Sequence, residues 1–126
     1  MLSVEKIGGT SMSAFQDVLR NIIIGKRKPE EMYNRILVVS AYNNVTNWLL
    51  EHKKTGVPGI YVKFLNKEDY KSALDELLKK LQEINRLYAD IKLDIAIADE
   101  FIKSRIEKAK NYLNSMAQVL ASGYVG

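Results

Sequence analysis

The sequence contains no cysteine and a single histidine, His52. Without cysteine the chain can form neither a disulfide nor a thiolate metal site, and one histidine excludes a metal site built from several histidines. The lack of cysteine is also compatible with a cytosolic setting. Function classes that depend on such sites are therefore excluded.

Long apolar runs are missing as well. No stretch approaches the roughly 18 to 20 apolar residues that a membrane-spanning helix requires. The N-terminus also lacks a basic segment followed by an apolar one, which is the pattern of an export signal. We therefore expect a soluble, cytoplasmic protein with no membrane partner.

What is present suits one small folded unit. The chain has 126 residues, of which 47% are hydrophobic, and this is enough to bury a single core. A formal net charge of +4 permits an anionic partner without requiring one. The one compact basic cluster, residues 26–28, lies beside Pro29 with no aromatic residues interleaved, so we expect no nucleic-acid partner and keep that partner as the minor alternative.

The stretch "VEKIGGTSMS" joins a short apolar strand to a helix through paired glycines. Gly8 and Gly9 tolerate positive φ and let another group approach the backbone closely. Ser13, followed three residues later by Gln16, fits a capping box, and apolar residues then recur at helical spacing as far as Ile23. A strand that turns into a helix points free backbone N–H groups and the positive end of the helix dipole at one place, which favours phosphate.

Three side chains could complete such a phosphate site. Lys6 would supply a full positive charge, and Thr10 and Ser11 would supply hydroxyl donors. The alternative is an ordinary turn beside a solvated lysine. Paired glycines are common, so this motif alone does not decide between the two.

A second strand follows in "NRILVVSAY", where residues 36–39 form a continuous apolar run. Such a run is typical of a parallel strand covered on both faces. The strand ends at Ser40, and a turn and a helix follow. Asn44 suits a left-handed turn residue, Thr46 or a nearby Asn suits a helix cap, and Gly56 with Pro58 would close the helix.

The second half of the chain is helical in pattern. From Asn66, a candidate N-cap, apolar residues recur every three to four positions, and they do so again from Ile95 to Leu120. The sequence therefore predicts an α/β fold, with an opening β-α-β portion followed by two long amphipathic helices that pack as a core or a hairpin. Because two parallel strands make a poor sheet, we expect an incomplete domain without an internal boundary, covering residues 1–126.

The two strand ends resemble a known family. "KIGGTS", residues 6–11, is similar to the N-terminal signature of aspartokinases, members of the amino acid kinase superfamily, and "VVSAYNNVTNWLL", residues 38–50, resembles their second signature. "LLEHKKTGVPGIY" and "FIKSRI" resemble the aspartokinases of ectoine biosynthesis. The resemblance implies the opening portion of a three-layer amino acid kinase fold.

The resemblance also implies roles for individual residues. Lys6, as a catalytic residue, and the glycines of the first motif would contact the ATP phosphates, and the other residues of the same pocket would be Thr10, Ser11 and Ser40. Thr46 would help to hold L-aspartate. Without the resemblance, Ser40 reads as the end of a strand and Thr46 as a helix cap. The implied cofactors are ATP and Mg²⁺ bound through the nucleotide, and no metal ligand of the protein itself is expected.

The chain also departs from the family pattern. Many aspartokinases have glycine where this chain has Asn44, whose side chain can crowd the substrate pocket. The family's aspartate-binding glutamate motif, nucleotide-base pocket and regulatory ACT domains have no counterpart here. The resemblance therefore implies the N-terminal fragment of an aspartate kinase, inactive when isolated, from a parent that is a homo-oligomer.

Two other functions remain open. The chain could be a non-catalytic module that binds phosphate or a partner, in which case its fold would be self-sufficient. It could also come from an amino acid kinase that acts on glutamate or carbamate, although Thr46 in its "VTN" context argues against this. His52 could be a general base, but a solvated or helix-terminal histidine is the preferred interpretation. Arg105 matches an arginine of the ectoine-type group without a physical role that we can assign.

Overall fold

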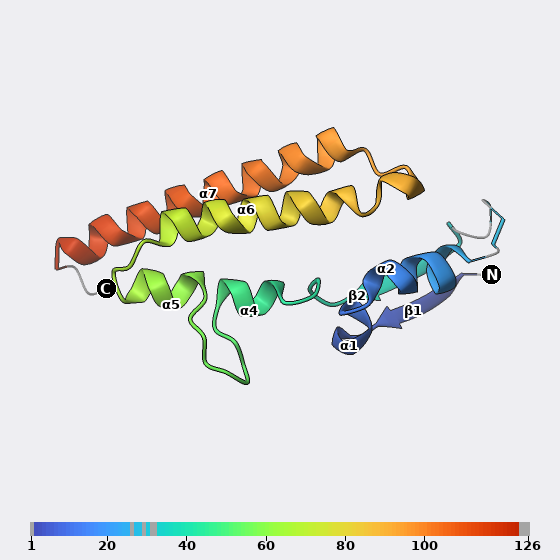
Figure 1. Cartoon of the computed structure of the whole chain (residues 1–126), viewed down its shortest axis with the longest axis horizontal. Coiled ribbons are helices and arrows are strands. Elements are labelled where there is room, and N and C mark those ends of the chain that lie inside the picture. The colour runs from blue at the N-terminus through green and yellow to red at the C-terminus, as the bar shows by residue number, and fades with distance from the viewer. Residues whose placement is uncertain (1, 26, 29, 31–32, 124–126) are drawn as a thin grey trace.

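The computed structural model describes residues 2–25, 27–28, 30 and 33–123. Figure 1 shows a small unit of strands and short helices at the N-terminal end and a long helical hairpin that runs across the molecule. The α/β class predicted from the sequence is confirmed. Two residues of the basic cluster region, 26 and 29, lie outside the described residues.

The N-terminal unit is the predicted β-α-β arrangement. Strands β1 (Ser3–Ile7) and β2 (Arg35–Val39) pair in parallel. Between them the chain forms α1 (Gly9–Met12), α2 (Phe15–Val18) and a wider π-helical segment, η1 (Leu19–Ile24). The strand ends therefore meet at one edge of the sheet, as in any parallel pair.

The described residues cover one face of this sheet only in part, since Leu37 and Val39, on the same face as Ile7, are 36% and 54% exposed. Ile7 is buried in a cluster with Met12, Val18 and Ile23, which come from the helical layer. On the other face Val4 is 69% exposed and Val38 is 49% exposed. The expectation that the second strand is covered on both faces is therefore wrong within this part of the chain, because no second layer packs there.

A part-buried ion pair ties the two strands to the helical layer. Arg35 donates from Nε to the carboxylate of Glu5 at 2.5 Å, and its Nη1 donates to the carbonyl of Ile23. The Arg35 hydrogen bond holds the pKa of the Glu5 carboxyl below its usual value. This ion pair lies on the face of the sheet that the helical layer covers. On that face Glu5 of β1 stands opposite Leu37 of β2.

Two predicted helix caps are wrong. Helix α2 has Ala14 as its N-cap, with no side-chain cap hydrogen bond, so the predicted N-cap at Ser13 lies one residue too early. The long helix α6 (Tyr70–Arg86) begins after Asp69, whose carboxylate accepts from the Ser72 N–H at 3.1 Å. Asn66 does not cap this helix because it is the C-cap of α5, and helix resumes only at Tyr70.

The segment after the second strand turns as expected but its helix is short. Asn44 has φ 62°, the left-handed conformation predicted for this position. Helix α4 (Val45–Leu49) then ends well before Gly56, where the sequence predicted its end. A loop follows, and the chain resumes helix in α5 (Ile60–Leu65).

The second half forms the predicted pair of long helices. Helix α6 and helix α7 (Ile95–Ala121) are connected through η2, a 3₁₀ turn at Ala89–Ile91, and lie side by side in Figure 1. Their shared core includes Leu74, which is 1% exposed, and Ile106. Helices α4 and α5 contribute to the same core through Trp48 and Ile60.

Helix α7 does not bury all of its predicted apolar positions. Ile102, Ile106, Ala109 and Leu113 contribute to the core shared with α6. A second set of apolar residues on α7 remains exposed: Phe101 59%, Tyr112 70%, Met116 48% and Leu120 59%. The periodicity identified the helix correctly, but spacing alone could not distinguish the stripe that meets α6 from its neighbour.

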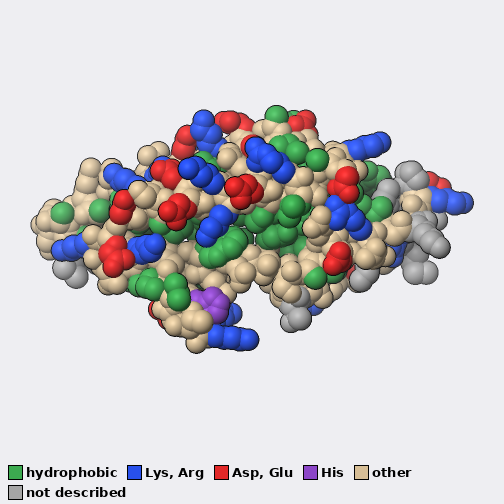
Figure 2. Space-filling view, viewed as in Figure 1, with side chains coloured by type: hydrophobic (Ala, Val, Ile, Leu, Met, Phe, Trp, Pro, Cys, Tyr) green, Lys and Arg blue, Asp and Glu red, His purple; other side chains and the backbone are tan. Residues whose placement is uncertain are grey.

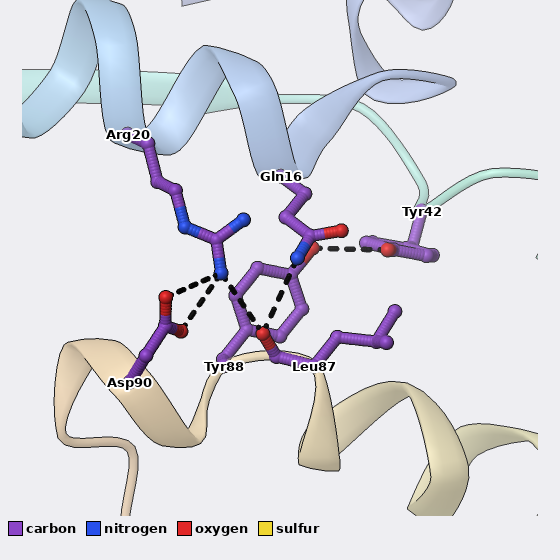
Figure 3. A network of polar contacts seen from close by, with 6 residues as sticks. All are labelled: Gln16, Arg20, Tyr42, Leu87, Tyr88 and Asp90. Atoms are coloured by element: carbon purple, nitrogen blue, oxygen red, sulfur yellow. Dashed lines mark hydrogen bonds and ion pairs between the residues drawn. The ribbon is translucent and has the colours of Figure 1, made fainter.

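A polar and aromatic network joins the helical hairpin to the N-terminal unit (Figure 3). Arg20 donates from Nη2 to both carboxylate oxygens of Asp90, at 2.7 and 2.8 Å, and to the carbonyl of Leu87 at 3.1 Å. The hydroxyls of Tyr42 and Tyr88 are 2.9 Å apart. Burial and the bond to Tyr42 raise the pKa of the Tyr88 hydroxyl. The hairpin is thus attached through its loop end to η1, by Arg20, and to the segment that follows β2, by Tyr42.

The Arg20–Asp90 ion pair should make stability fall in acid. Its hydrogen bond lowers the pKa of the Asp90 carboxyl, so the ion pair stabilises the folded chain above the ordinary aspartate pKa of about 3.9 and is lost as pH falls through the lower folded value. We expect Asp90→Asn to lower the urea midpoint at pH 7, with the difference from wild type vanishing toward pH values of about 2. Urea unfolding over this pH range measures it, and a difference that stays constant would contradict the assignment.

Candidate functional site

The two sequence motifs meet at one cavity of about 270 Å³. Gly9 from the first motif lines it together with Ser40 and Thr46 from the second. A Cβ on Gly9 would lie 4.0 Å from Ser40 Oγ, so the two strand ends are close neighbours. The backbone supports this approach, because the Ser40 N–H donates to the carbonyl of Ile7 at 3.2 Å.

Parallel pairing explains why these residues converge. Ile7 and Val39 are in register at the carboxyl ends of β1 and β2, so the segments after both strands leave from the same edge of the sheet. Ligands of open α/β sheets bind at such carboxyl edges. Gly9 begins helix α1 directly, and Thr46 lies in the first turn of α4.

The other predicted phosphate residues lie outside the cavity lining. Lys6 is exposed on β1, beside Val38, and the strand alternation places it on the open face of the sheet, opposite Ile7. Gly8 precedes α1, and Ser11 is exposed within α1. Thr10 is the second residue of α1, and its side chain is outside the description.

The glycines are not explained by the conformation of the turn. Neither Gly8 nor Gly9 has a positive φ, so that part of the sequence interpretation is wrong. A Cβ on Gly8 would meet no atom within 4 Å. The chain itself therefore places no steric demand on Gly8, and the space beside its backbone is open.

The cavity has a polar lining with one charged residue. Asn43, Asn44, Asn47 and Lys53 line it, together with Ala41 and Tyr42. Among the described residues of this lining none is acidic. Amide groups, hydroxyls and a lysine suit an anionic, hydrogen-bonding ligand better than a metal ion, whose protein ligands would be carboxylates.

Sequence reasoning missed Lys53 and the two other asparagines. Lys53 is seven residues beyond Thr46, in a stretch whose only sequence signal was its resemblance to the ectoine-type group. Its place in the cavity depends on a loop that turns back beside α4, which periodicity does not reveal. Tyr42 was also missed, and its hydroxyl connects the cavity wall to Tyr88.

His52 and Arg105 do not lie in this lining. His52 is half-buried, and its Nδ1 accepts from the backbone N–H groups of Lys54 and Thr55 at 3.2 and 3.1 Å. This is a turn-forming role, in keeping with the preferred interpretation over a general base. Arg105 stands over the ring of Phe101, 5.1 Å from its centroid, which is a cation–π contact within α7.

No site for a metal ion emerges from the part of the chain that the structure describes, where no group of three or more His, Asp or Glu side chains comes together. Among the same residues, no helix is both long and apolar enough to cross a membrane. On the face seen in Figure 2, basic and acidic side chains are interspersed over the helical hairpin. Such interspersed charge is typical of solvated helix faces.

Comparison with known proteins gives one strong match. The chain is 42% identical over 127 aligned residues to the aspartate kinase Ask_Ect of Stutzerimonas stutzeri (strain A1501). The match covers 98% of this chain but only 27% of that relative's length. The predicted resemblance is therefore confirmed along nearly the whole chain. No protein-family model matches the chain, and no solved structure does so either.

Proposed function

We propose that this chain is the N-terminal part of an ATP-dependent aspartate kinase, which transfers the terminal phosphoryl group of ATP to the side-chain carboxylate of L-aspartate. The observation that carries the proposal is the convergence of both signatures, through Gly9, Ser40 and Thr46, on one polar cavity. The 42% identity to an aspartate kinase supports it independently.

The ATP phosphates would bind at the first motif. Gly8 has open space beside its backbone and no steric reason within the chain to be glycine, which supports a close approach by a ligand. Lys6 would neutralise phosphate charge as the catalytic residue, and N–H groups of the first turn of α1 would add donors. Gly9, Thr10, Ser11 and Ser40 complete this proposed pocket.

The amino-acid substrate would occupy the part of the cavity nearest Thr46. The Thr46 hydroxyl can form a hydrogen bond with a carboxylate or ammonium group of the substrate. Asn44 keeps the left-handed turn conformation, so the loop accommodates asparagine where many aspartokinases have glycine. These residues would need only to position the substrate and to stabilise charge, because phosphoryl transfer depends on those two effects.

Magnesium fits this site through the nucleotide and not through protein ligands. The described residues of the cavity lining include no carboxylate, so the ATP phosphates would hold the magnesium ion. When bound, Mg²⁺ neutralises phosphate charge during transfer. The residues of this chain would orient the phosphates and the acceptor carboxylate in line.

The fold supports a fragment of a larger domain. One sheet face leaves Val4, Ile36 and Val38 exposed, at 69%, 48% and 49%, and a further layer of the parent would cover them. We propose that the parent belongs to the ectoine branch, is cytoplasmic and homo-oligomeric, and that the isolated 126 residues are inactive.

The test is a phosphotransfer assay of the whole protein that contains this chain. We expect ADP release that depends on L-aspartate, together with an acyl phosphate that hydroxylamine traps as the hydroxamate. L-Glutamate in place of L-aspartate serves as the control for another amino acid kinase. ADP release unchanged by omission of L-aspartate would reject aspartate as the phosphoryl acceptor. No ADP release with either amino acid would reject the kinase proposal and favour a non-catalytic phosphate-binding or partner-binding module.

A further inference from the structure

Lys53 is the charged residue of the cavity that holds Gly9, Ser40 and Thr46. None of the ion pairs within the described residues engages its ammonium group. The other polar groups of the lining are neutral hydroxyls and amides. A cation without an acidic partner in a polar cavity is suited to an anionic ligand.

The loop that carries Lys53 is held in place by its own hydrogen bonds. The His52 N–H donates to the carbonyl of Val57 at 3.0 Å, and the Gly56 N–H donates to the carbonyl of His52 at 2.8 Å. Gly56 has φ 69°, a left-handed conformation that favours glycine. These bonds close the loop into a turn, and they fix the position of the Lys53 backbone within it.

The base of this loop is fixed against helix α4. The Gly59 N–H donates to the carbonyl of Leu50 at 2.9 Å. A Cβ on Gly59 would lie 2.5 Å from the Leu50 carbonyl oxygen and 2.6 Å from that of Trp48, so only glycine allows this approach. The loop and the helix that carries Thr46 are thereby held together, which fixes the backbone of Lys53 relative to Thr46.

We propose that Lys53 binds a carboxylate of the amino-acid substrate, beside Thr46. This inference rests on the proposed function, since it assigns the anion in the cavity to aspartate. The lysine is a compact point charge with three donors, which a carboxylate can accept. Its neighbour Lys54 is in the same loop but does not line the cavity, and so provides a matched control.

The test compares Lys53→Met, Lys53→Arg and Lys54→Met in the whole protein by steady-state kinetics. Loss of a charged hydrogen bond is expected to raise KM for L-aspartate at least about tenfold in Lys53→Met. KM for ATP should stay within about twofold of wild type, Lys53→Arg should recover part of the loss, and Lys54→Met should resemble wild type. A raised KM for ATP instead would assign Lys53 to phosphate and overturn the proposal, as would a Lys53→Met protein with unchanged KM for both substrates.

Calorimetric binding of L-aspartate without ATP separates this inference from the proposed function. Binding that weakens in Lys53→Met but not in Lys54→Met supports the carboxylate site even where no phosphorylation is found, and only the kinase proposal then fails. Phosphorylation of aspartate with binding equally strong in all variants keeps the kinase proposal and rejects the role of Lys53. L-Asparagine, run in parallel, reports whether the side-chain carboxylate is the group that Lys53 contacts.

Discussion

Lys6→Ala in the whole protein is expected to lower kcat for aspartyl phosphate formation roughly 10²- to 10³-fold, the loss typical of removing one group that stabilises transition-state charge. Lys6 is exposed on β1, two residues before Gly8, and among the described residues no side-chain hydrogen bond or ion pair explains its presence. Steady-state assay with saturating ATP and L-aspartate measures the change.

The control for Lys6 is Lys103→Ala, which removes an exposed lysine from helix α7, in the opposite half of the chain. Both variants should unfold within about 0.5 kcal/mol of wild type, as substitutions at exposed positions usually do. A Lys6→Ala protein that is stable and has the kcat of wild type would remove Lys6 from the proposed catalytic machinery.

Leu74→Ala is expected to cost about 2–5 kcal/mol of unfolding free energy, because a buried leucine loses its transfer energy and leaves a cavity. Leu74 is 1% exposed and lies in the core with Ile60, Leu77 and Ile106, where helices α5, α6 and α7 meet. Since domains of this size are stable by only about 5–15 kcal/mol, this one change would remove a large share of the total.

Urea unfolding followed by the fluorescence of Trp48 measures this cost. Trp48 is the one tryptophan of the sequence and packs against the same core from helix α4, so its signal reports the contact between the hairpin and the helix that carries Thr46. Ile97→Ala is the control, because Ile97 is 68% exposed and its truncation leaves no buried cavity. Equal losses in the two variants would mean that the core is not organised around Leu74.

The cavity at the strand ends shows which residues of the candidate site could be predicted from the sequence. Gly9, Ser40 and Thr46 were each predicted as site residues from motifs separated by some thirty residues, and the structure places all three around one space. Lys53 escaped prediction because its position depends on a closed loop and on the close approach of Gly59 to helix α4. Such contacts are made between segments, and no local pattern records them.

The sequence by itself determined the elements and the candidate chemistry of this protein. Its periodicities identified two parallel strands and two long helices, its absences excluded cysteine and multi-histidine sites, and "KIGGTS" with the "VTN" segment indicated a phosphate and amino-acid site. These features are local, because backbone preference and side-chain spacing act over a few residues.

Only the tertiary structure decided which surfaces those elements cover. It placed one stripe of helix α7 on α6 and left Phe101 and Tyr112 exposed, it capped α6 with Asp69 in place of Asn66, and it left one face of the sheet open. It also brought Lys53 into the cavity beside Thr46. The physical reason is that burial depends on which other element arrives at a surface, and that pairing is a property of the whole folded chain.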